Sequence, residues 1–546
     1  MGKRRRQDGA PGRSTDPGWR WLACGALAVL VAVVTFDPRL YINGDNVSYM
    51  FLARDVLHGD LWPSSKFPPL FPWMLAPIQW IVGVFRSGTV VPSAALFPQK
   101  LLVLVLYAGS VALLVRVLRR RVATPAGPWV ALVAATLLPV VEYAHYVMSE
   151  IPFLFCLLGS IDAADRLLAT ERSGTGEDPP APADRVRTGA RAWMTALRGR
   201  TVWELALWVA AGFYIRSAGL AAGLGIGCAL LGHRRVGQAM AYAAAVALLM
   251  VPWGWHALAT PGGNPYFQQF LLVNPYYPEF GRLDVSGFFE RVWFNLRAYG
   301  GTHIPITVAP FPYRSTYSPP LWQRTSAPWW LAAPLLALIV VGAVRQVRRF
   351  DPAAWATVVS IVLVLSWPPV WAANRFLIPL APLLFWLLWE GLRLDLARPI
   401  VWARGRGVVM VLFLVFAALT LRNYYAETRA YDPVWKNYFE TIRWVAQNTP
   451  PDALIIDRKP GFVEFLSGRS ARTFPREANL DRMIDFFRGA GADYVLLNRL
   501  PYDDIGRYLV PVVNERPQHF EIQFRIDDPE RDPALNGDAY VFQFLP

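Results

Sequence analysis

The sequence predicts a polytopic α-helical membrane protein with a small α/β domain at its C-terminal end, and three observations support this. The chain of 546 residues is 54% hydrophobic and only 17% charged, whereas soluble domains carry about a quarter charged residues. Its arginines gather in short segments between long apolar runs, which is the orientation signal of membrane proteins. From about residue 430, short apolar runs alternate with amphipathic stretches, as in an α/β layer. Because the net charge of +14 follows the short loops, it does not indicate a nucleic-acid partner.

Eleven apolar runs are long enough to cross a hydrocarbon core of about 30 Å as helices. The first follows a basic segment, 1–19, and is interpreted as a retained signal anchor because no cleavage motif of small residues follows it. The predicted spans lie near 20–36, 97–117, 128–143, 147–167, 202–217, 219–233, 237–257, 327–344, 353–371, 376–393 and 407–424.

The arginine clusters set the expected orientation in a plasma or inner membrane. With these clusters in the cytoplasm, the N-terminus and the polar linker 168–200 are cytoplasmic. The loops 37–96 and 258–326 and the soluble domain 430–546 then lie outside, and the membrane domain covers 20–425. The loop 258–326 is rich in Tyr, Phe, Trp and Pro, so we expect it to cover the membrane surface as a partial lid.

The segment 430–546 is expected to form a mostly parallel sheet with helices. No repeat, glycine-rich phosphate motif or Cys/His metal pair appears, and the cysteines Cys24, Cys156 and Cys228 sit in apolar runs without a disulfide pattern. The pattern predicts helices at 438–447 and 480–489 and strands at 453–457, 494–498, 519–525 and 539–544.

Asp45 is the main candidate for a catalytic residue. It follows a turn at Asn43-Gly44 directly after the first span, where lipid meets water. Helical spacing of apolar residues from Tyr49, ended by Gly59, predicts a helix in the interface plane. Asp45 is therefore either a general base at the interface or simply the N-cap of this helix. Asn46, which opens a glycosylation-like Asn-Val-Ser triplet, is interpreted as a coincidental match.

Glu150 is the second carboxylate of interest, at the outer end of the fourth span. An ionisable group near lipid is costly and marks a site by default, although a first-turn Glu is also favoured by the helix dipole. His145 lies about one turn earlier and could act as a metal ligand, a base or an interfacial side chain. A single histidine without a spaced partner is weak evidence for a metal.

Three cations are expected on the same outer face. Lys66 is one of only five lysines in the chain, and Arg216 and Arg375 lie at the outer ends of two spans. They could together bind a lipid phosphate, or each could reach separately to the interface by snorkelling.

Taken together, these motifs resemble the GT-C superfamily of membrane glycosyltransferases, in the branch of protein O-mannosyltransferases and lipid A aminoarabinose transferases. The resemblance covers about residues 20–425. It rests on four motifs in family order: Gly44-Asp45-Asn-Val-Ser-Tyr49-Met-Phe-Leu-Ala53, Pro68-Pro69-Leu70-Phe71, Ser149-Glu150-Ile-Pro152 and Arg375-Phe-Leu-Ile-Pro379.

The resemblance implies an inverting transfer of a sugar from a polyprenyl-phosphate donor to an extracytoplasmic glycolipid, polysaccharide or protein. Asp45 would deprotonate the acceptor hydroxyl, with Glu150 as the second catalytic carboxylate. Arg216, Arg375 and Lys66 would stabilise the departing phosphate, and Tyr49, His145 and Asn46 are further pocket candidates.

Two positions depart from the family pattern. Asn46 stands where many members have an acid, and Phe67 stands where His or Lys is common before Pro68-Pro69-Leu70. Dependence on a divalent metal is therefore open, and the sequence assigns no metal ligand.

Two other functions compete with the enzyme. A transporter or flippase for lipid-linked glycans would place its charges near the bilayer midplane. A non-catalytic glycan-binding membrane protein would tolerate changes at Asp45.

Overall fold

The computed structural model describes ten parts of the chain. They are residues 18–85, 92–122, 125–170, 196–260, 265–309, 329–371, 373–393, most of 407–425, 430–530 and 536–546.

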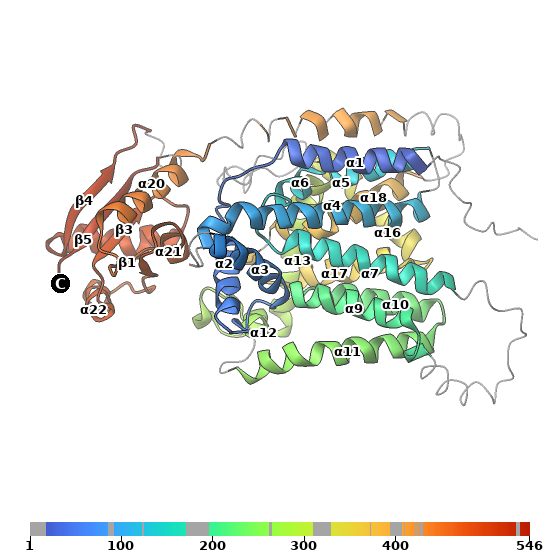
Figure 1. The fold of residues 1–546 in the computed structure, drawn as a ribbon, viewed down its shortest axis with the longest axis horizontal. Helices are drawn as coiled ribbons and strands as arrows, with labels where there is room; N and C mark the ends of the chain where they lie inside the picture. Colours follow the sequence, from blue (N-terminus) through green and yellow to red (C-terminus); the bar gives the residue numbers. More distant parts are fainter. Residues whose placement is uncertain are drawn as a thin grey trace, which may run out of the picture.

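Long apolar helices lie side by side and form a bundle (Figure 1). Four helical stretches are long and apolar enough to cross a membrane, namely Ser93–Arg121, Val236–Ala259, Trp329–Val347 and Asn374–Leu392. These support the predicted membrane protein, while the count of eleven spans stays a prediction. The bundle helices are α1 (Gly18–Val34), α4 (Leu96–Arg121), α5 (Gly127–Ala135), α6 (Leu138–Tyr143), α7 (Glu150–Thr170), α9 (Arg200–Ile215), α10 (Gly219–Gly232), α11 (Val236–Ala259), α16 (Trp329–Val347), α17 (Pro352–Ser366) and α18 (Ala381–Leu392).

One predicted span differs in the structure, and one apolar helix was not predicted. The expected single span at 128–143 is broken into α5 and α6. Pro139 lies in the first turn of α6, where its missing N–H is tolerated, but it could not have continued α5. The outer loop 37–96 also contains an unexpected apolar helix, α3 (Leu70–Phe85), which accommodates Pro77 in its interior.

The outer segments carry three more helices near one end of the bundle (Figure 1). They are α2 (Gly44–Leu57), α12 (Pro265–Leu271) and α13 (Val285–Ala298). As predicted, α2 ends before Gly59, whose φ of 98° lies in the left-handed region that glycine adopts freely. Of the expected lid, 261–264 and 310–328 lie outside the described residues.

The C-terminal segment folds around one five-stranded sheet of order β2-β1-β3-β5-β4. All predicted helices and strands are confirmed, but the sheet is mixed rather than mostly parallel. β2, β1 and β3 run parallel, whereas β5 pairs antiparallel with both β3 and β4. The elements are α20 (Pro433–Asn448), β1 (Leu454–Ile456), α21 (Pro460–Ser467), β2 (Ser470–Arg472), α22 (Leu480–Ala490), β3 (Tyr494–Asn498), α23 (Val510–Glu515), β4 (Phe520–Ile526) and β5 (Ala539–Phe544).

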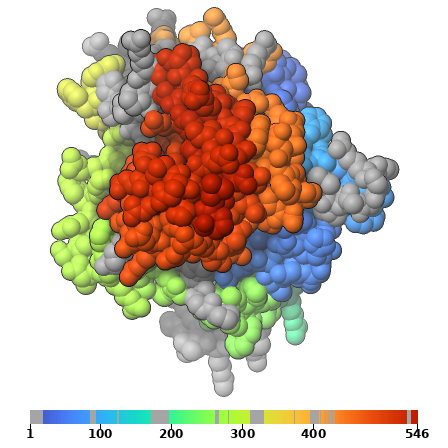
Figure 2. Space-filling view, turned by 90° about the vertical axis from the view of Figure 1, so that its left-hand side faces the viewer, coloured from blue at the N-terminus to red at the C-terminus, as the bar shows by residue number. Residues whose placement is uncertain are grey.

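This sheet domain lies beyond the end of the bundle that carries α2 (Figure 1). Figure 2 looks onto that end, and the C-terminal residues cover its centre, flanked by blue residues on one side and green residues on the other. α2 packs against α21 through Phe51 and Phe465. Their rings meet edge-on, with centroids 6.3 Å apart. The hydroxyl of Tyr431 also donates to the carbonyl of Leu40 at 2.8 Å.

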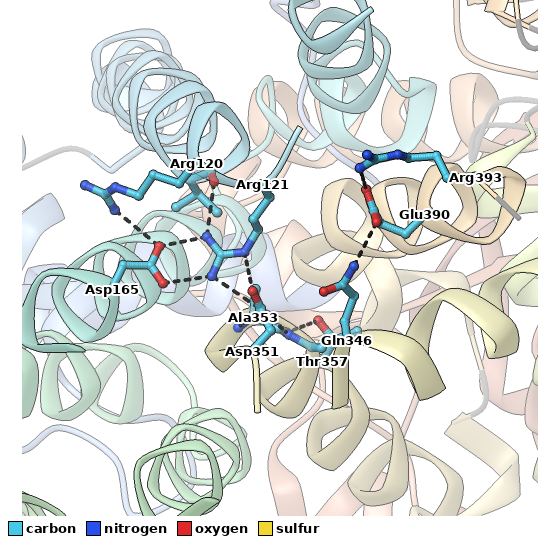
Figure 3. A network of polar contacts seen from close by, with 11 residues as sticks. Arg120, Arg121, Asp165, Gln346, Asp351, Ala353, Thr357, Glu390 and Arg393 are labelled. Carbon is cyan, nitrogen blue, oxygen red and sulfur yellow. Dashed lines mark hydrogen bonds and ion pairs between the residues drawn. The ribbon is translucent and has the colours of Figure 1, made fainter. Parts of the chain in front are cut away.

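The other end of the bundle is closed by ion pairs around Arg121, which is 7% exposed (Figure 3). Its guanidinium contacts Asp165 of α7 at 2.7 Å and Asp351, which caps α17, at 2.9 Å. Because α7 begins at Glu150 and rises about 1.5 Å per residue, Asp165 lies roughly 22 Å from Glu150. We call Arg121, Asp165 and Asp351 the Arg121 network.

Candidate active site

Asp45 is positioned by the first turn of α2. The helix is capped by Asn43, whose side-chain oxygen accepts a hydrogen bond from the backbone N–H of Asp45 at 3.0 Å. The carboxylate of Asp45 is therefore not used as the N-cap. It is left free to contact other parts of the chain.

Two arginines and two carboxylates form a continuous chain of ion pairs. Arg375 joins the carboxylates, because its Nη2 lies 2.8 Å from Oδ2 of Asp45 and its Nε lies 3.3 Å from Oε1 of Glu150. Arg216 approaches the same Glu150 oxygen to 2.6 Å through Nη1. The four residues come from α2, from the 3-10 helix Asn374–Leu380, from the first residue of α7 and from the end of α9.

Neighbouring hydroxyl groups fix this cluster. The hydroxyl of Ser149 accepts hydrogen bonds from Arg216 Nη1 and from the hydroxyl of Tyr49, each at 3.0 Å. Glu150 is fully buried, and its Oε2 has no hydrogen-bond partner among the described residues. A buried carboxylate between two guanidiniums is stabilised by them and in turn holds them in place.

The charge of Asp45 depends on these cations. Burial raises the pKa of its carboxyl, but the guanidinium of Arg375 and the charges of Lys66 and Arg216 lower it, and the pKa lies below the ordinary Asp value. Asp45 is therefore an ionised carboxylate at neutral pH. It can accept a hydrogen bond or, as that bond shortens, a proton.

The cluster opens into a cavity of about 1,570 Å³. Asp45, Tyr49, Lys66, Arg216 and Arg375 all line it. The ammonium of Lys66 lies over the rings of Phe67 and Tyr266, at 5.2 and 5.5 Å from their centroids. Among the described residues, no carboxylate forms an ion pair with Lys66.

The walls of the cavity differ in chemical character. One wall is apolar and aromatic, and comes from the membrane helices α11 and α17 and the segments next to them. A second wall, the domain wall, comes from the C-terminal domain. It mixes the polar side chains of Lys459, Asn498, Arg499 and Asp503 with apolar and aromatic ones such as Trp435, Leu500 and Tyr502. The apolar wall includes Leu220, Trp253, Ala257, Leu258, Leu363, Val364, Trp367 and Trp371.

Two pocket candidates do not reach the cavity. His145 is buried, and its Nε2 lies 2.8 Å from the carbonyl oxygen of Ala32 on α1. Asn46 points inward too, with Nδ2 3.4 Å from the carbonyl oxygen of Tyr41. Within the described parts of the chain, no three His, Cys, Asp or Glu side chains lie close enough to hold a metal ion. Metal dependence therefore stays open.

Several cavity residues were not anticipated. Tyr266 and Phe267 come from α12, and the sequence signalled them only through the aromatic composition of the 258–326 loop. Trp253 lies in the last two turns of α11 and looks like any apolar residue of a span. Lys459 lies in a domain whose position against α2 is not visible in the sequence.

Neither protein-family models nor curated protein sequences match this chain. Solved structures do share its fold. ArnT from Cupriavidus metallidurans, bound to undecaprenyl phosphate, is 13% identical with a TM-score of 0.51, over 96% of this chain and 98% of that one. The oligosaccharyltransferase of Archaeoglobus fulgidus, tethered to an acceptor peptide, is 13% identical with a TM-score of 0.53, over 96% of this chain and 74% of that one. The chain thus shares the overall fold of these two structures.

Proposed function

We propose that this chain, with its GT-C fold, is an inverting glycosyltransferase that moves a sugar from a polyprenyl-phosphate donor to an extracytoplasmic acceptor. One observation carries the proposal. A carboxylate, Asp45, and the cations Lys66, Arg216 and Arg375 line one large cavity, which also has an apolar and aromatic wall from the helices α11 and α17 and the segments next to them. A lipid-linked phosphate sugar needs both kinds of surface at once.

The apolar wall suits the polyprenyl chain, and the cations suit its phosphate. In this proposal Lys66 is the first cation to bind the donor phosphate, because it has no carboxylate partner among the described residues. The phosphate then competes with Asp45 for Arg375. As Arg375 turns toward the phosphate, the pKa of Asp45 rises, and the carboxylate becomes a stronger base at the moment it is needed.

The reaction is a single displacement at the anomeric carbon of the sugar. Asp45 takes the proton of the acceptor hydroxyl while the acceptor oxygen forms a bond to that carbon. The bond between the carbon and the phosphate oxygen breaks with inversion, and the electron pair leaves with the polyprenyl phosphate. Arg216 and Arg375 stabilise the added negative charge, and Glu150 keeps both arginines in position.

The cellular arrangement follows the charge pattern. We place the N-terminus in the cytoplasm, and Asp45 and the C-terminal domain outside a plasma or inner membrane. The acceptor is a glycolipid, an envelope polysaccharide or a protein. The relatives in fold support this substrate class, since one was solved with undecaprenyl phosphate and the other with an acceptor peptide.

The decisive experiment measures the consumption of radiolabelled polyprenyl-phosphate sugars by purified protein and by Asp45→Asn. Loss of a general base lowers a rate by about 100- to 10,000-fold, so Asp45→Asn is expected to consume donor at least 100 times more slowly. Asp55→Asn is the matched control, because Asp55 lies on the same helix, 39% exposed, and pairs with Arg54. It is expected to retain the wild-type rate.

Thermal stability of both variants is measured alongside, so that loss of folding is not mistaken for loss of catalysis. Equal rates for stable Asp45→Asn and Asp55→Asn would exclude Asp45 as the base. Binding of donor without consumption by the wild-type protein would favour a transporter or a glycan-binding protein instead.

A further inference from the structure

Two of the five lysines of the chain line the same cavity from different walls. Lys66 belongs to the loop before α3, and Lys459 belongs to the C-terminal domain, directly after β1. Of the other three, Lys100 and Lys436 do not line it, and Lys3 lies outside the described residues. The proposed donor site uses Lys66, which leaves the role of Lys459 unexplained.

The backbone of Lys459 is held by a buried carboxylate. Asp457, fully buried at the end of β1, accepts hydrogen bonds from the backbone N–H of Lys459 at 2.7 Å and from the hydroxyl of Tyr438 at 2.6 Å. It also accepts one at 3.2 Å from the side-chain amide of Asn498, at the end of β3. This arrangement fixes Lys459 at the carboxyl ends of two adjacent parallel strands, the edge at which open α/β sheets bind ligands.

The side chain of Lys459 reaches from the domain to α2. Its Nζ lies 4.5 Å from the centroid of the Tyr502 ring. A Cβ placed on Gly44 would lie 3.7 Å from the same Nζ. The ammonium group of Lys459 therefore lies beside the first residue of α2, which directly precedes the proposed base Asp45.

Lys459 has no carboxylate partner within ion-pair distance among the described residues. Its neighbour in sequence shows the contrast, since Arg458 pairs with Asp504 at 2.7 Å and does not line the cavity. An unpaired ammonium beside a tyrosine ring in a cavity is available to a ligand.

The charge balance of the cavity points to an anion. Arg375 and Arg216 are already paired with carboxylates. The domain wall adds Lys459 and Arg499, and Arg499 reaches its nearest carboxylate, Asp538, only at 3.9 Å. Of the five basic side chains that line the cavity, Lys66 and Lys459 are the two with no carboxylate within ion-pair distance among the described residues.

We propose that Lys459, assisted by Arg499, binds an anionic group of the acceptor, a phosphate or a carboxylate carried close to the hydroxyl that receives the sugar. That this anion belongs to an acceptor rests on the proposed function. The donor phosphate is committed to the membrane side by its polyprenyl chain, so the domain wall faces the substrate that arrives from water. In this proposal Lys459 and Arg499 select acidic acceptors over neutral ones.

The low number of lysines allows a direct test in the full-length protein. Lysines are ¹³C-dimethylated, which keeps their charge, and the protein is placed in phosphatidylcholine nanodiscs. Each lysine signal is assigned by its Lys→Arg variant. The probes are glucose 6-phosphate, methyl glucoside as its neutral control, and undecaprenyl phosphate.

Glucose 6-phosphate is expected to shift the Lys459 signal, and methyl glucoside is not. Lys459→Met is expected to weaken glucose 6-phosphate binding about tenfold, as for the loss of one charge-assisted hydrogen bond. Lys459→Arg should retain binding, and Lys436→Met, an exposed lysine of α20, serves as the unaffected control.

Three results would overturn the proposal: no lysine shift with the sugar phosphate, a shift of Lys66 alone, or a shift of Lys459 by undecaprenyl phosphate. The last would assign Lys459 to the donor. The proposed function fails separately, if undecaprenyl phosphate does not shift Lys66 while glucose 6-phosphate still shifts Lys459.

Discussion

Arg375 is the residue that connects the two carboxylates of the site, and its contribution can be isolated. In Arg375→Met the cation that lowers the pKa of Asp45 is lost, so that pKa rises. Because the base acts deprotonated, the acid limb of the pH–rate profile is expected to move to higher pH. The rate at neutral pH should fall about 100-fold, since a stabilising donor for the leaving phosphate is gone.

Arg375→Lys should restore only part of this rate, because one ammonium cannot span Asp45 and Glu150 as the planar guanidinium does. Arg54→Met, which changes an exposed arginine of α2, is the control. An acid limb that stays in place in Arg375→Met would show that Arg375 does not set the protonation of Asp45.

The charged residues of the site could be predicted from the sequence, because a charged side chain near lipid is energetically costly and therefore stands out. Asp45, Glu150, Arg216 and Arg375 each stand out beside apolar runs, and the structure brings them together. The orientation of the His145 side chain could not be predicted. His145 lies in an irregular turn between α6 and α7, where no periodicity defines a buried face.

At the scale of elements, α16 and α18 pack with their backbones in direct contact. A Cβ on Gly342 would lie 1.9 Å from the carbonyl oxygen of Leu387, and a Cβ on Gly391 would lie 2.0 Å from that of Leu338. Gly342→Ala is therefore expected to force the helices apart and to destabilise the protein by about 1–3 kcal/mol. Thermal unfolding in detergent measures this.

Gly254→Ala provides the comparison, because a Cβ at this position of α11 would meet no atom within 4 Å. Equal melting temperatures for the two variants would contradict the close packing of α16 on α18.

Elements were predictable where one periodicity extended over their whole length. The two C-terminal helices and four strands that were expected all form, because their apolar spacing and their turns agree. Two prolines in apolar runs have opposite effects on helix boundaries. Pro139 separates α5 from α6 inside one apolar run, whereas Pro77 sits within α3 without ending it. The mixed sheet could not be foreseen because the pairing of β5 with β3 depends on tertiary contacts.

At the scale of the whole molecule, the Arg121 network should determine stability and leave the chemistry intact. Arg121→Met leaves the side chains of Asp165 and Asp351, which are 12% and 16% exposed, without their main partner. Breaking a buried pair in this way costs about 3–5 kcal/mol. A large fall in melting temperature is expected, with donor consumption per folded molecule unchanged.

Arg120→Met is the comparison, since Arg120 is the adjacent residue and is 41% exposed. Arg120 also pairs with Asp165 at 3.2 Å and with Asp162 at 2.8 Å, but it forms no ion pair with Asp351, so its loss is expected to lower the melting temperature less. A melting temperature of Arg121→Met no lower than that of Arg120→Met would show that the network does not hold α4, α7 and α17 together.

The separation of the Arg121 network from the cavity also bears on how the lipid-linked donor reaches Asp45. No member of the network lines the cavity, and α7 places about 22 Å of packed helix between the two ends. On the proposed function, a carrier lipid loaded on the cytoplasmic leaflet cannot be handed through this molecule to Asp45. On the same proposal, we expect a separate translocator to turn the loaded carrier over before it reaches Asp45.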